Sequence, residues 1–572
     1  MSCANRGVGP QGGPKDSIPP MPVRSIPVNG TVNFDGKKLD ILFNEYIQLN
    51  NIGSNLMMSP PQQTPPDVKA RGKRVLVQFK DSLRDSTTYT LDFGDAICDY
   101  TEKNPLHGYS FAFSTGDIID TLELRGQVFD GENNNPLVDI YVGIHSDLSD
   151  TAFVSMPFSR IAKTDTAGCF RIGNIRAGTY RLYAVDDVSR DYRLTMGEAL
   201  AFADNTITLP GDSTFPIMFL FREKQQRLYL QRTLRESQHL IRFLFSSSPD
   251  SVPRFRVLRP SEMDSTASDS AWIDPSPYIH AHYSPKRDTV SLWLTDSIAI
   301  SQDTLTFEAR YRRTDSLFRL EWYTDTLRAV WRAPRLTAKA REAQERQNRN
   351  RRLELKTNAQ KKFEIYDTLW LSSSTPLASI KRDSIHLVER IDTLLKPVAF
   401  TIEPYDTLPM KLRFVASLAP DKKYELRLDS AALHDVYGVS HVAASYGFQL
   451  KTVEDYSTLR VKISPFDSKA RIQVLSPKDK VIRELPADRE GTLFEYLHPD
   501  TYYLRMYIDE NGDGQWTTGS WTEKRQPEKI YYYSEKITTK SNWDFEEEWE
   551  YTAASQTSKP AELIKASKSK KK

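Results

Sequence analysis

The chain contains, at the centre of its first strand-rich segment, the alternating stretch Thr88-Tyr89-Thr90-Leu91-Asp92-Phe93. A period of two indicates a β-strand with one buried face. Further strand-like runs at residues 39–43 and 75–79 are separated by proline clusters. About seven short strands in a segment of this length is the pattern of a β-sandwich. We therefore predict a sandwich domain over residues 20–117.

The same pattern occurs a second time, which indicates an internal repeat. In both segments a leucine precedes a tyrosine that begins an apolar alternation, and an alanine and an aspartate follow. The matched residues are Leu83, Tyr89, Leu91, Phe93, Ala96 and Asp99 in the first copy, and Leu418, Tyr424, Leu426, Leu428, Ala431 and Asp435 in the second, where Asp435 lies one residue later than the strict spacing. We therefore predict a second sandwich of the same kind over residues 363–455.

Two further segments form a second related pair. The strand-like run Thr179–Asp186 lies in residues 118–213, and it has a counterpart, Thr501–Asp509, in residues 456–550. Residues 214–334 are also rich in alternating strands, and we expect a separate β-sandwich there. The predicted fold class is therefore all-β, with tandem sandwiches and small β domains.

Three segments are predicted to lie outside these domains. Residues 1–19 form a linker rich in glycine and proline. Residues 335–362 have helix-forming composition, with ten basic and three acidic residues, which predicts a solvated basic helical linker. A patch for phosphate or anionic lipid is the alternative there. Residues 551–572 contain six lysines and one glutamate, and they are predicted to be a disordered tail.

Composition and missing motifs exclude several classes of function. Lys plus Arg is 77 and Asp plus Glu is 75, so the net charge is +2, which argues against a dedicated nucleic-acid binder. Three cysteines are too few for a disulfide-stapled scaffold. No G-x-S-x-G, H-E-x-x-H or Walker-type loop occurs. We predict that the protein is not an enzyme and has no catalytic residues.

The start of the chain bears on its location. Cys3 is followed by small polar residues and then by the flexible linker. A mature lipoprotein begins in this way, with an acylated cysteine and a linker that holds the body away from the membrane. The alternative is an ordinary terminus with a chance cysteine. We predict lipidation at Cys3.

Several motifs resemble a group of Gram-negative envelope lipoproteins that carry an SbsA-type bacterial Ig-like domain. The motifs are Cys3-Ala4-Asn5, Gly12-Gly13-Pro14-Lys15-Asp16, Phe43-Asn44-Glu45-Tyr46, Thr87-Thr88-Tyr89-Thr90-Leu91 and Phe113-Ser114-Thr115-Gly116-Asp117. Residues 118–213 resemble the transthyretin-like fold of carboxypeptidase regulatory domains, and residues 490–549 resemble the C-terminal module of the same group. We predict a second transthyretin-like domain over residues 456–550. The resemblance implies tandem Ig-like and transthyretin-like domains in a lipid-anchored, non-catalytic protein of the outer membrane.

One loop carries half of a calcium-binding pattern. Asp509, Asn511, Asp513 and Gly514 match D-x-[DN]-x-[DN]-G, in which alternate oxygen ligands suit a hard cation. The twelfth position is Ser520 instead of a bidentate glutamate. A calcium site and a plain polar turn capped by its own side chains both remain open. No other cofactor is expected.

Aromatic residues gather near the C-terminus, where Trp516, Trp521 and Trp543 are candidates for a surface that binds a partner protein or a glycan. The competing interpretation is that these side chains lie in a domain core or in a contact between domains.

The motifs and the resemblance together predict a structural or accessory subunit for protein–protein assembly at the outer membrane. A machine that assembles or exports outer-membrane proteins is one setting for such a subunit. The expected partners are outer-membrane or envelope proteins, the membrane is reached through the lipid anchor, and no nucleic acid is bound. The alternative is a surface glycan-binding lipoprotein. The sequence leaves open whether the body lies on the periplasmic or the cell-surface side.

Overall fold

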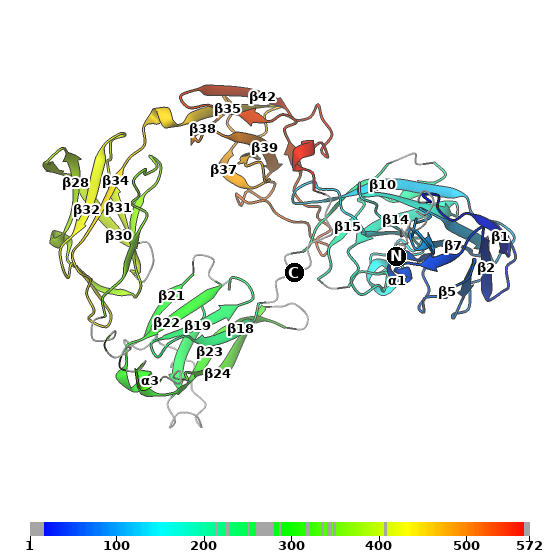
Figure 1. The fold of residues 1–572 in the computed structure, drawn as a ribbon, viewed down its shortest axis with the longest axis horizontal. Helices are drawn as coiled ribbons and strands as arrows, with labels where there is room; N and C mark the ends of the chain where they lie inside the picture. The colour runs from blue at the N-terminus through cyan, green and yellow to red at the C-terminus, as the bar shows by residue number, and fades with distance from the viewer. Residues whose placement is uncertain are drawn as a thin grey trace, which may run out of the picture.

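The computed structural model describes residues 16–195, 197–211, 215–223, 228–249, 251–258, 279–284, 288–315, 320–332, 337–339, 342, 346, 351–404 and 409–565. The described residues fold into five β domains, shown in Figure 1. They are domain 1 (16–119), domain 2 (120–223), domain 3 (228–332), domain 4 (351–455) and domain 5 (456–565). The predicted all-β class is confirmed. Within the described part of the chain, no helix has the length and apolar character needed to cross a membrane.

Domain 1 is a sandwich of a four-stranded sheet, β1-β2-β6-β5, and a three-stranded sheet, β4-β7-β9, with a short β3-β8 pair at its side. Both main sheets contribute to one apolar core. Its elements are β1 (Pro22–Ile26), β2 (Lys38–Phe43), β3 (Ile47–Leu49), α1 (Ile52–Asn55), β4 (Met57–Ser59), β5 (Asp67–Arg71), β6 (Arg74–Gln78), β7 (Thr88–Asp92), β8 (Ile97–Asp99) and β9 (Ser110–Ser114).

Domain 4 has the same plan, with the sheets β25-β26-β31-β30 and β29-β28-β32-β34 and a short β27-β33 pair. Its elements are β25 (Leu355–Thr357), β26 (Leu369–Ser373), β27 (Leu377–Ile380), η3 (Arg382–Ser384), β28 (Ile385–Ile391), β29 (Leu394–Pro397), β30 (Phe400–Pro404), β31 (Lys411–Ala416), β32 (Lys423–Leu428), β33 (Leu433–Asp435), β34 (Ala444–Gln449) and η4 (Val453–Asp455).

The side chains that predicted this repeat occupy equivalent places in the two domains. The Tyr89 hydroxyl accepts a hydrogen bond from the backbone N–H five residues earlier (2.7 Å), and the Tyr424 hydroxyl does the same (2.8 Å). Each tyrosine ring stacks on a phenylalanine of the neighbouring strand, Phe113 or Phe448, with centroids 5.5 and 5.7 Å apart. Each tyrosine therefore joins one end of its strand to the preceding loop, and the repeat holds at the level of single contacts.

Domains 2 and 5 form the second related pair. Each has a three-stranded sheet with one parallel pair and a larger sheet of five strands. Domain 2 contains β10 (Leu122–Asp130), β11 (Tyr141–His145), α2 (Ala152–Ser155), β12 (Arg160–Lys163), β13 (Cys169–Ile175), β14 (Gly178–Val185), β15 (Leu200–Phe202), β16 (Ile207–Leu209) and β17 (Ile217–Leu220). Domain 5 contains β35 (Ser457–Ser464), β36 (Ala470–Leu475), β37 (Val481–Pro486), β38 (Thr492–Leu497), β39 (Thr501–Ile508), β40 (Ile530–Tyr532), β41 (Ile537–Thr538), β42 (Asp544–Glu550) and η5 (Ala561–Leu563).

The predicted relation between these two domains also holds in their contacts. The Tyr180 and Tyr502 hydroxyls each donate to the backbone carbonyl four residues earlier, at 2.7 Å in both cases. The transthyretin-like resemblance itself stays a prediction.

Domain 3 is a sandwich of the sheets β18-β19-β22-β21 and β20-β23-β24 around one core. Its elements are β18 (Leu230–Arg235), β19 (Leu240–Phe245), β20 (Arg254–Leu258), β21 (Ile279–Tyr283), β22 (Thr289–Leu294), α3 (Ser297–Ser301), β23 (Thr304–Thr314) and β24 (Leu320–Val330).

The structure corrects three predicted boundaries. Domain 2 extends beyond residue 213, because β17 pairs in parallel with β10. The predicted helical linker 335–362 lies mostly outside the described residues, and β25 at its end already pairs with β26 of domain 4. The predicted disordered tail is wrong for residues 551–565, because this segment contains η5 and the fully buried side chain of Leu563. Residues 566–572 lie outside the described part.

Domain 2 contains a buried histidine that makes its stability depend on pH. His145 is 1% exposed between the rings of Phe158 and Tyr183, and burial lowers its pKa from 6.5 to about 4. The nearby charged groups are Asp147, Arg181 on the paired strand and Asp150, which is bonded to Arg181.

In the unfolded chain the His145 imidazole becomes protonated below about pH 6.5, whereas in the folded domain its pKa is about 4 and it stays neutral down to that pH. We therefore expect domain 2 to lose about 3 kcal/mol of stability as the pH falls through this window. Hydrogen exchange of the β11 amides, corrected for intrinsic rates, measures this loss. His145→Phe should flatten the dependence, and an unchanged slope in that variant would contradict the assignment.

Candidate functional site

The structure separates the three tryptophans that we predicted to form one surface. The Trp516 indole N–H donates to the Glu528 carbonyl (3.0 Å) within domain 5. Trp521 is packed against domain 2, and Trp543 is 57% exposed with its ring stacked on Phe545. The prediction of one shared aromatic surface is therefore corrected: the three tryptophans lie at separate sites. Trp543 is exposed, whereas Trp516 and Trp521 are half-buried. Cys3 lies outside the described residues.

Trp521 is the apolar centre of a contact between domains 5 and 2. Its ring meets Phe153, Tyr183 and Phe202 edge to face, with centroids 5.4, 5.8 and 5.6 Å apart. These three residues belong to the second core cluster of domain 2, so the indole of domain 5 extends that cluster. The contact matches the interpretation that a C-terminal tryptophan lies between domains.

Backbone and side-chain hydrogen bonds surround the ring. The Thr518 hydroxyl donates to the Arg222 carbonyl (3.0 Å), and the backbone N–H of Trp521 donates to the Glu223 carboxylate. The Gln526 side chain donates both to the Phe202 carbonyl (2.9 Å) and to Asp204 (2.7 Å). An apolar centre with a polar rim is the usual anatomy of a specific protein interface.

Close backbone approach explains one glycine in the same loop. A Cβ added at Gly519 would lie 2.6 Å from the ring of Phe221 in domain 2. Only glycine allows the loop to approach domain 2 so closely.

A second group of contacts involves the C-terminal segment that was predicted to be disordered. The Lys559 ammonium donates to the Asn133 carbonyl (2.7 Å) and the Asn135 side chain (2.9 Å) in domain 2 and to Asp479 (2.7 Å) in domain 5. The Lys559 and Asp479 side chains are only 1% and 9% exposed. The Asn134 side chain donates to the Ile530 (3.2 Å) and Gln556 (2.8 Å) carbonyls. A buried lysine is stable when it is paired and hydrogen-bonded in this way.

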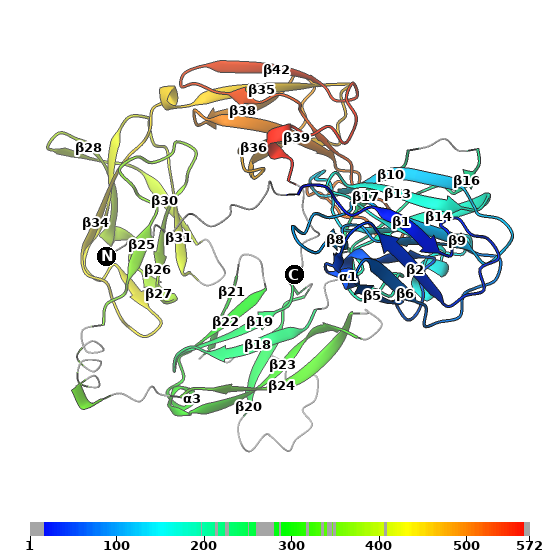
Figure 2. The ribbon, with the colours of Figure 1, turned by 45° about the vertical axis from the view of Figure 1, so that its right-hand side comes forward.

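These two groups of contacts, named here the closing interface, join domain 5 to domain 2. Two further pairs of neighbouring domains are in contact. The Tyr437 hydroxyl of domain 4 donates to the Leu294 carbonyl of domain 3 (3.0 Å), and Tyr456 of domain 5 donates to Glu364 of domain 4 (2.6 Å). Figures 1 and 2 show domains 2 to 5 following one another around a closed path. The chain is thus a frame whose end returns to its second domain.

The candidate calcium loop satisfies its own backbone. The Asp509 carboxylate accepts hydrogen bonds from the backbone N–H groups of Gly512 (2.7 Å), Asp513 (3.1 Å) and Gly514 (2.9 Å). The Glu528 carboxylate accepts from Glu510 (2.9 Å) and Thr517 (2.8 Å). Among the described residues, no group of three or more His, Cys, Asp or Glu side chains is arranged to hold a metal ion.

The repeat in domain 2 has the same arrangement without the calcium pattern. Asp187 accepts from the backbone N–H groups of Arg190 (2.5 Å) and Tyr192 (2.7 Å), and Glu198 accepts from Val188 (2.9 Å) and Thr195 (3.0 Å). The paired carboxylates therefore organise this loop in both domains. Calcium at Asp509, Asn511 and Asp513 stays a prediction.

We expect Asp509→Ala to destabilise domain 5 by about 2 kcal/mol, because the backbone N–H groups of Gly512 and Gly514 lose their acceptor. Hydrogen exchange of residues 509–517 measures the effect, with Asp165→Ala in a domain 2 turn as a control that should leave domain 5 unchanged. The same experiment with added calcium tests the metal. Protection of the wild-type loop that is lost in Asp513→Ala would support a bound cation, and no added protection would contradict it.

Comparison with known proteins identifies the class of the first domain. Residues 16–115 match the family model of the bacterial Ig-like domain. The chain is therefore a multidomain β-sandwich protein with a bacterial Ig-like domain in its N-terminal part. Among curated proteins, no significant relative is found.

Solved structures add only distant similarities. The N-terminal part of the bacterial S-layer protein SbsC is 13% identical (TM-score 0.13), covering 35% of this chain and 44% of that one. The S-layer protein rSbsC(31–844) is 8% identical (TM-score 0.13), covering 89% and 66%. The chain thus spans less than two thirds of either protein. A marsupial T cell receptor is 9% identical (TM-score 0.13), covering 58% and 100%.

Proposed function

We propose that the protein is a non-catalytic scaffold of the bacterial cell envelope, attached to the outer membrane through a lipid on Cys3. It acts as a structural or accessory subunit that holds a protein partner in place, in an assembly that builds or exports outer-membrane proteins. The observation that favours this role is the closing interface, because it turns a series of sandwich domains into a frame of defined shape. Ig-like β-sandwiches carry many unrelated functions, so the proposal rests on this contact and not on the fold alone.

The test is purification of the tagged full-length protein from its native membranes in mild detergent. The proposal predicts one near-stoichiometric envelope protein in the preparation and its loss when Trp521→Ala opens the frame. A lone, monodisperse protein would contradict the subunit role. Growth with labelled palmitate tests the anchor separately, with Cys3→Ala as the variant that should lose the label.

A glycan-binding role is the second candidate, and one observation favours it. Trp543 is exposed, lies nearly parallel to Phe545 (26° between ring planes) and has the Lys540 ammonium 5.2 Å from its ring centroid. Aromatic faces of this kind stack on sugars. Retention on immobilised glycans that is lost in Trp543→Ala, while partner binding is kept, would favour this role over the scaffold.

A further inference from the structure

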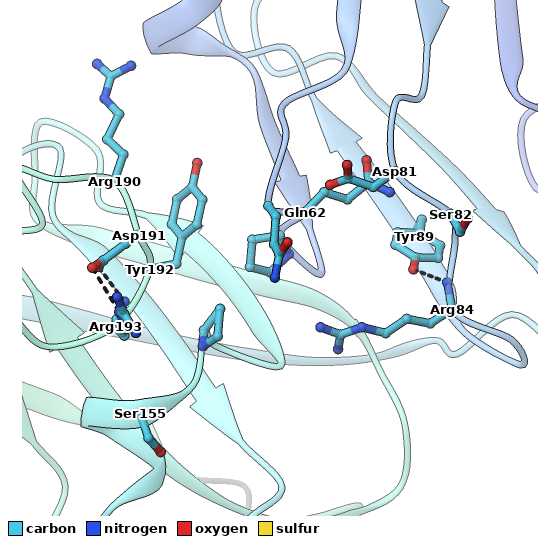
Figure 3. Close-up of a pocket in the computed structure, with 13 residues that line it drawn as sticks. Gln62, Asp81, Ser82, Arg84, Tyr89, Ser155, Arg190, Asp191, Tyr192 and Arg193 are labelled. Atoms are coloured by element: carbon cyan, nitrogen blue, oxygen red, sulfur yellow. Dashed lines mark hydrogen bonds and ion pairs between the residues drawn. The ribbon is translucent and has the colours of Figure 1, made fainter.

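A polar cleft of about 640 Å³ lies between domains 1 and 2, and none of the roles above uses it. Domain 1 contributes Gln62, Asp81 and Arg84 to its lining, and domain 2 contributes Ser155, Arg190 and Tyr192. Figure 3 shows these side chains on the two walls of the cleft.

The two walls are held firmly in place. The Arg160 guanidinium donates to the Ser59 carbonyl (3.1 Å), and the Ser59 hydroxyl accepts from the backbone N–H of Ile161 (3.1 Å). The Arg190 guanidinium donates to the Gly53 carbonyl (2.6 Å), and Met57 packs against both apolar clusters of domain 2. These contacts join domain 1 to domain 2 directly, so the cleft lies beside a packed contact between the two domains.

The side-chain amide of Gln62 has unsatisfied hydrogen-bonding groups that a ligand could satisfy. The oxygen and the nitrogen of its carboxamide are both buried, and neither has a hydrogen-bond partner among the described residues. A buried amide without partners is costly, so such groups usually have a role. One residue of an extended peptide satisfies both atoms at once, because its N–H and C=O flank the same Cα and point to the same side of the chain.

Arg84, Arg190 and Arg193 outnumber Asp81 and Asp191 in the lining of the cleft, so positive charge predominates there. No carboxylate of the described residues forms an ion pair with the Arg84 guanidinium, whereas the Arg193 guanidinium is paired with Asp191 (2.9 Å). The backbone N–H of Arg84 donates to the Tyr89 hydroxyl, which also lines the cleft and keeps its own proton, since burial raises the pKa of Tyr89. An arginine and a phenol together suit a carboxylate.

We propose that the cleft between domains 1 and 2 binds a peptide segment that carries a carboxylate next to a peptide bond. Gln62 pairs with the N–H and C=O of one extended residue, and Arg84 holds the carboxylate. The carboxylate comes either from the end of a chain or from an acidic side chain. A sugar fits less well, because the two aromatic side chains of the lining, Tyr89 and Tyr192, are both packed against other rings.

The test uses the full chain and fluorescein-labelled Ser-Gly-Ala-Ser-Gly-Ala with a free carboxylate, measured by fluorescence anisotropy. Two further peptides distinguish the sources: the same sequence with an amidated end, and an amidated peptide ending in aspartate. We expect amidation to weaken binding at least tenfold. Recovery with the aspartate peptide would assign the site to acidic side chains, and no recovery would assign it to chain ends.

Three variants test the residues. Gln62→Leu and Arg84→Gln should each weaken binding about tenfold, because each removes one of the two recognition groups. Arg24→Gln, an exposed arginine on β1 outside the cleft, should bind like the wild type. Circular dichroism confirms folding, and Gln62→Leu is not expected to unfold domain 1, since it removes unpaired polar atoms. Absence of binding, equal binding by the amidated peptide or the variants, or displacement by N-acetylglucosamine oligomers would each overturn the proposal.

Discussion

Replacing Trp521 with alanine is expected to release domain 5 from domain 2 while both domains stay folded. The indole is the single aromatic side chain that domain 5 inserts among Phe153, Tyr183 and Phe202. Loss of a tryptophan from such a packed site costs about 3 kcal/mol. Trp521 is not part of the core of domain 5 and packs on the outside of the second core cluster of domain 2, so most of the cost falls on the contact between the domains.

Small-angle X-ray scattering measures the outcome. The open variant should have a larger radius of gyration than the wild type and a broader distribution of interatomic distances. Trp543→Ala is the matched control, because this tryptophan is exposed and lies outside the closing interface. If Trp521→Ala scatters like the wild type, the apolar half of the interface does not hold the frame closed.

Lys559→Met is expected to cost about 3–5 kcal/mol at the other half of the closing interface. The substitution leaves Asp479 buried without its cation, and the Asn133 carbonyl of domain 2 loses its donor. The Asn135 side chain loses one of its two donors and keeps the backbone N–H of Lys565 (3.1 Å). Burial lowers the pKa of Lys559, and the Asp479 carboxylate offsets part of this effect by favouring the charged form. Breaking one side of such a pair is costly because the remaining charge is uncompensated.

Hydrogen exchange of residues 551–565 follows this loss. Lys536→Met is the control, since the Lys536–Glu562 pair is exposed and 3.9 Å long and should contribute little. The double variant Lys559→Met with Asp479→Leu should recover part of the stability, because no charge is then left buried. A double variant that is less stable than Lys559→Met would contradict the ion pair as the source of the effect.

The domain repeats could be predicted from the sequence because the patterns that define them extend over only a few residues. Tyr89 and Tyr424 stand at the same place in an alternating strand, and the strand period and the loop contact both arise within a few residues. For the Asp509 loop, the sequence could not distinguish a calcium site from a polar turn capped by its own side chains. The Asp509 carboxylate would serve in either case, as a calcium ligand or as an acceptor for backbone N–H groups. Glu528, which accepts from the backbone of the same loop, lies outside the sequence pattern.

The closing interface could not be predicted, because its halves lie far apart in the chain. Nothing near Trp521 indicates that its ring packs against Phe153, and the aromatic cluster is equally compatible with a partner surface. Lys559 lies in a lysine-rich segment whose composition indicates disorder. Its hydrogen bonds to Asn133 and Asn135 hold this part of the segment against domain 2. A role for Gln62 could not be predicted, because nothing in the sequence shows that its side-chain amide is buried without hydrogen-bond partners.

The most direct test of the account is the distance between domains 2 and 5 in the intact chain. Spin labels at Thr166→Cys and Glu535→Cys, two exposed positions, are placed in a variant whose native cysteines are replaced by alanine. Pulsed electron paramagnetic resonance then gives the distance distribution. The closed frame predicts a single narrow distribution that broadens towards long distances when Trp521→Ala is added. A distribution that is already broad in the parent chain, and unchanged by Trp521→Ala, would contradict the closed frame.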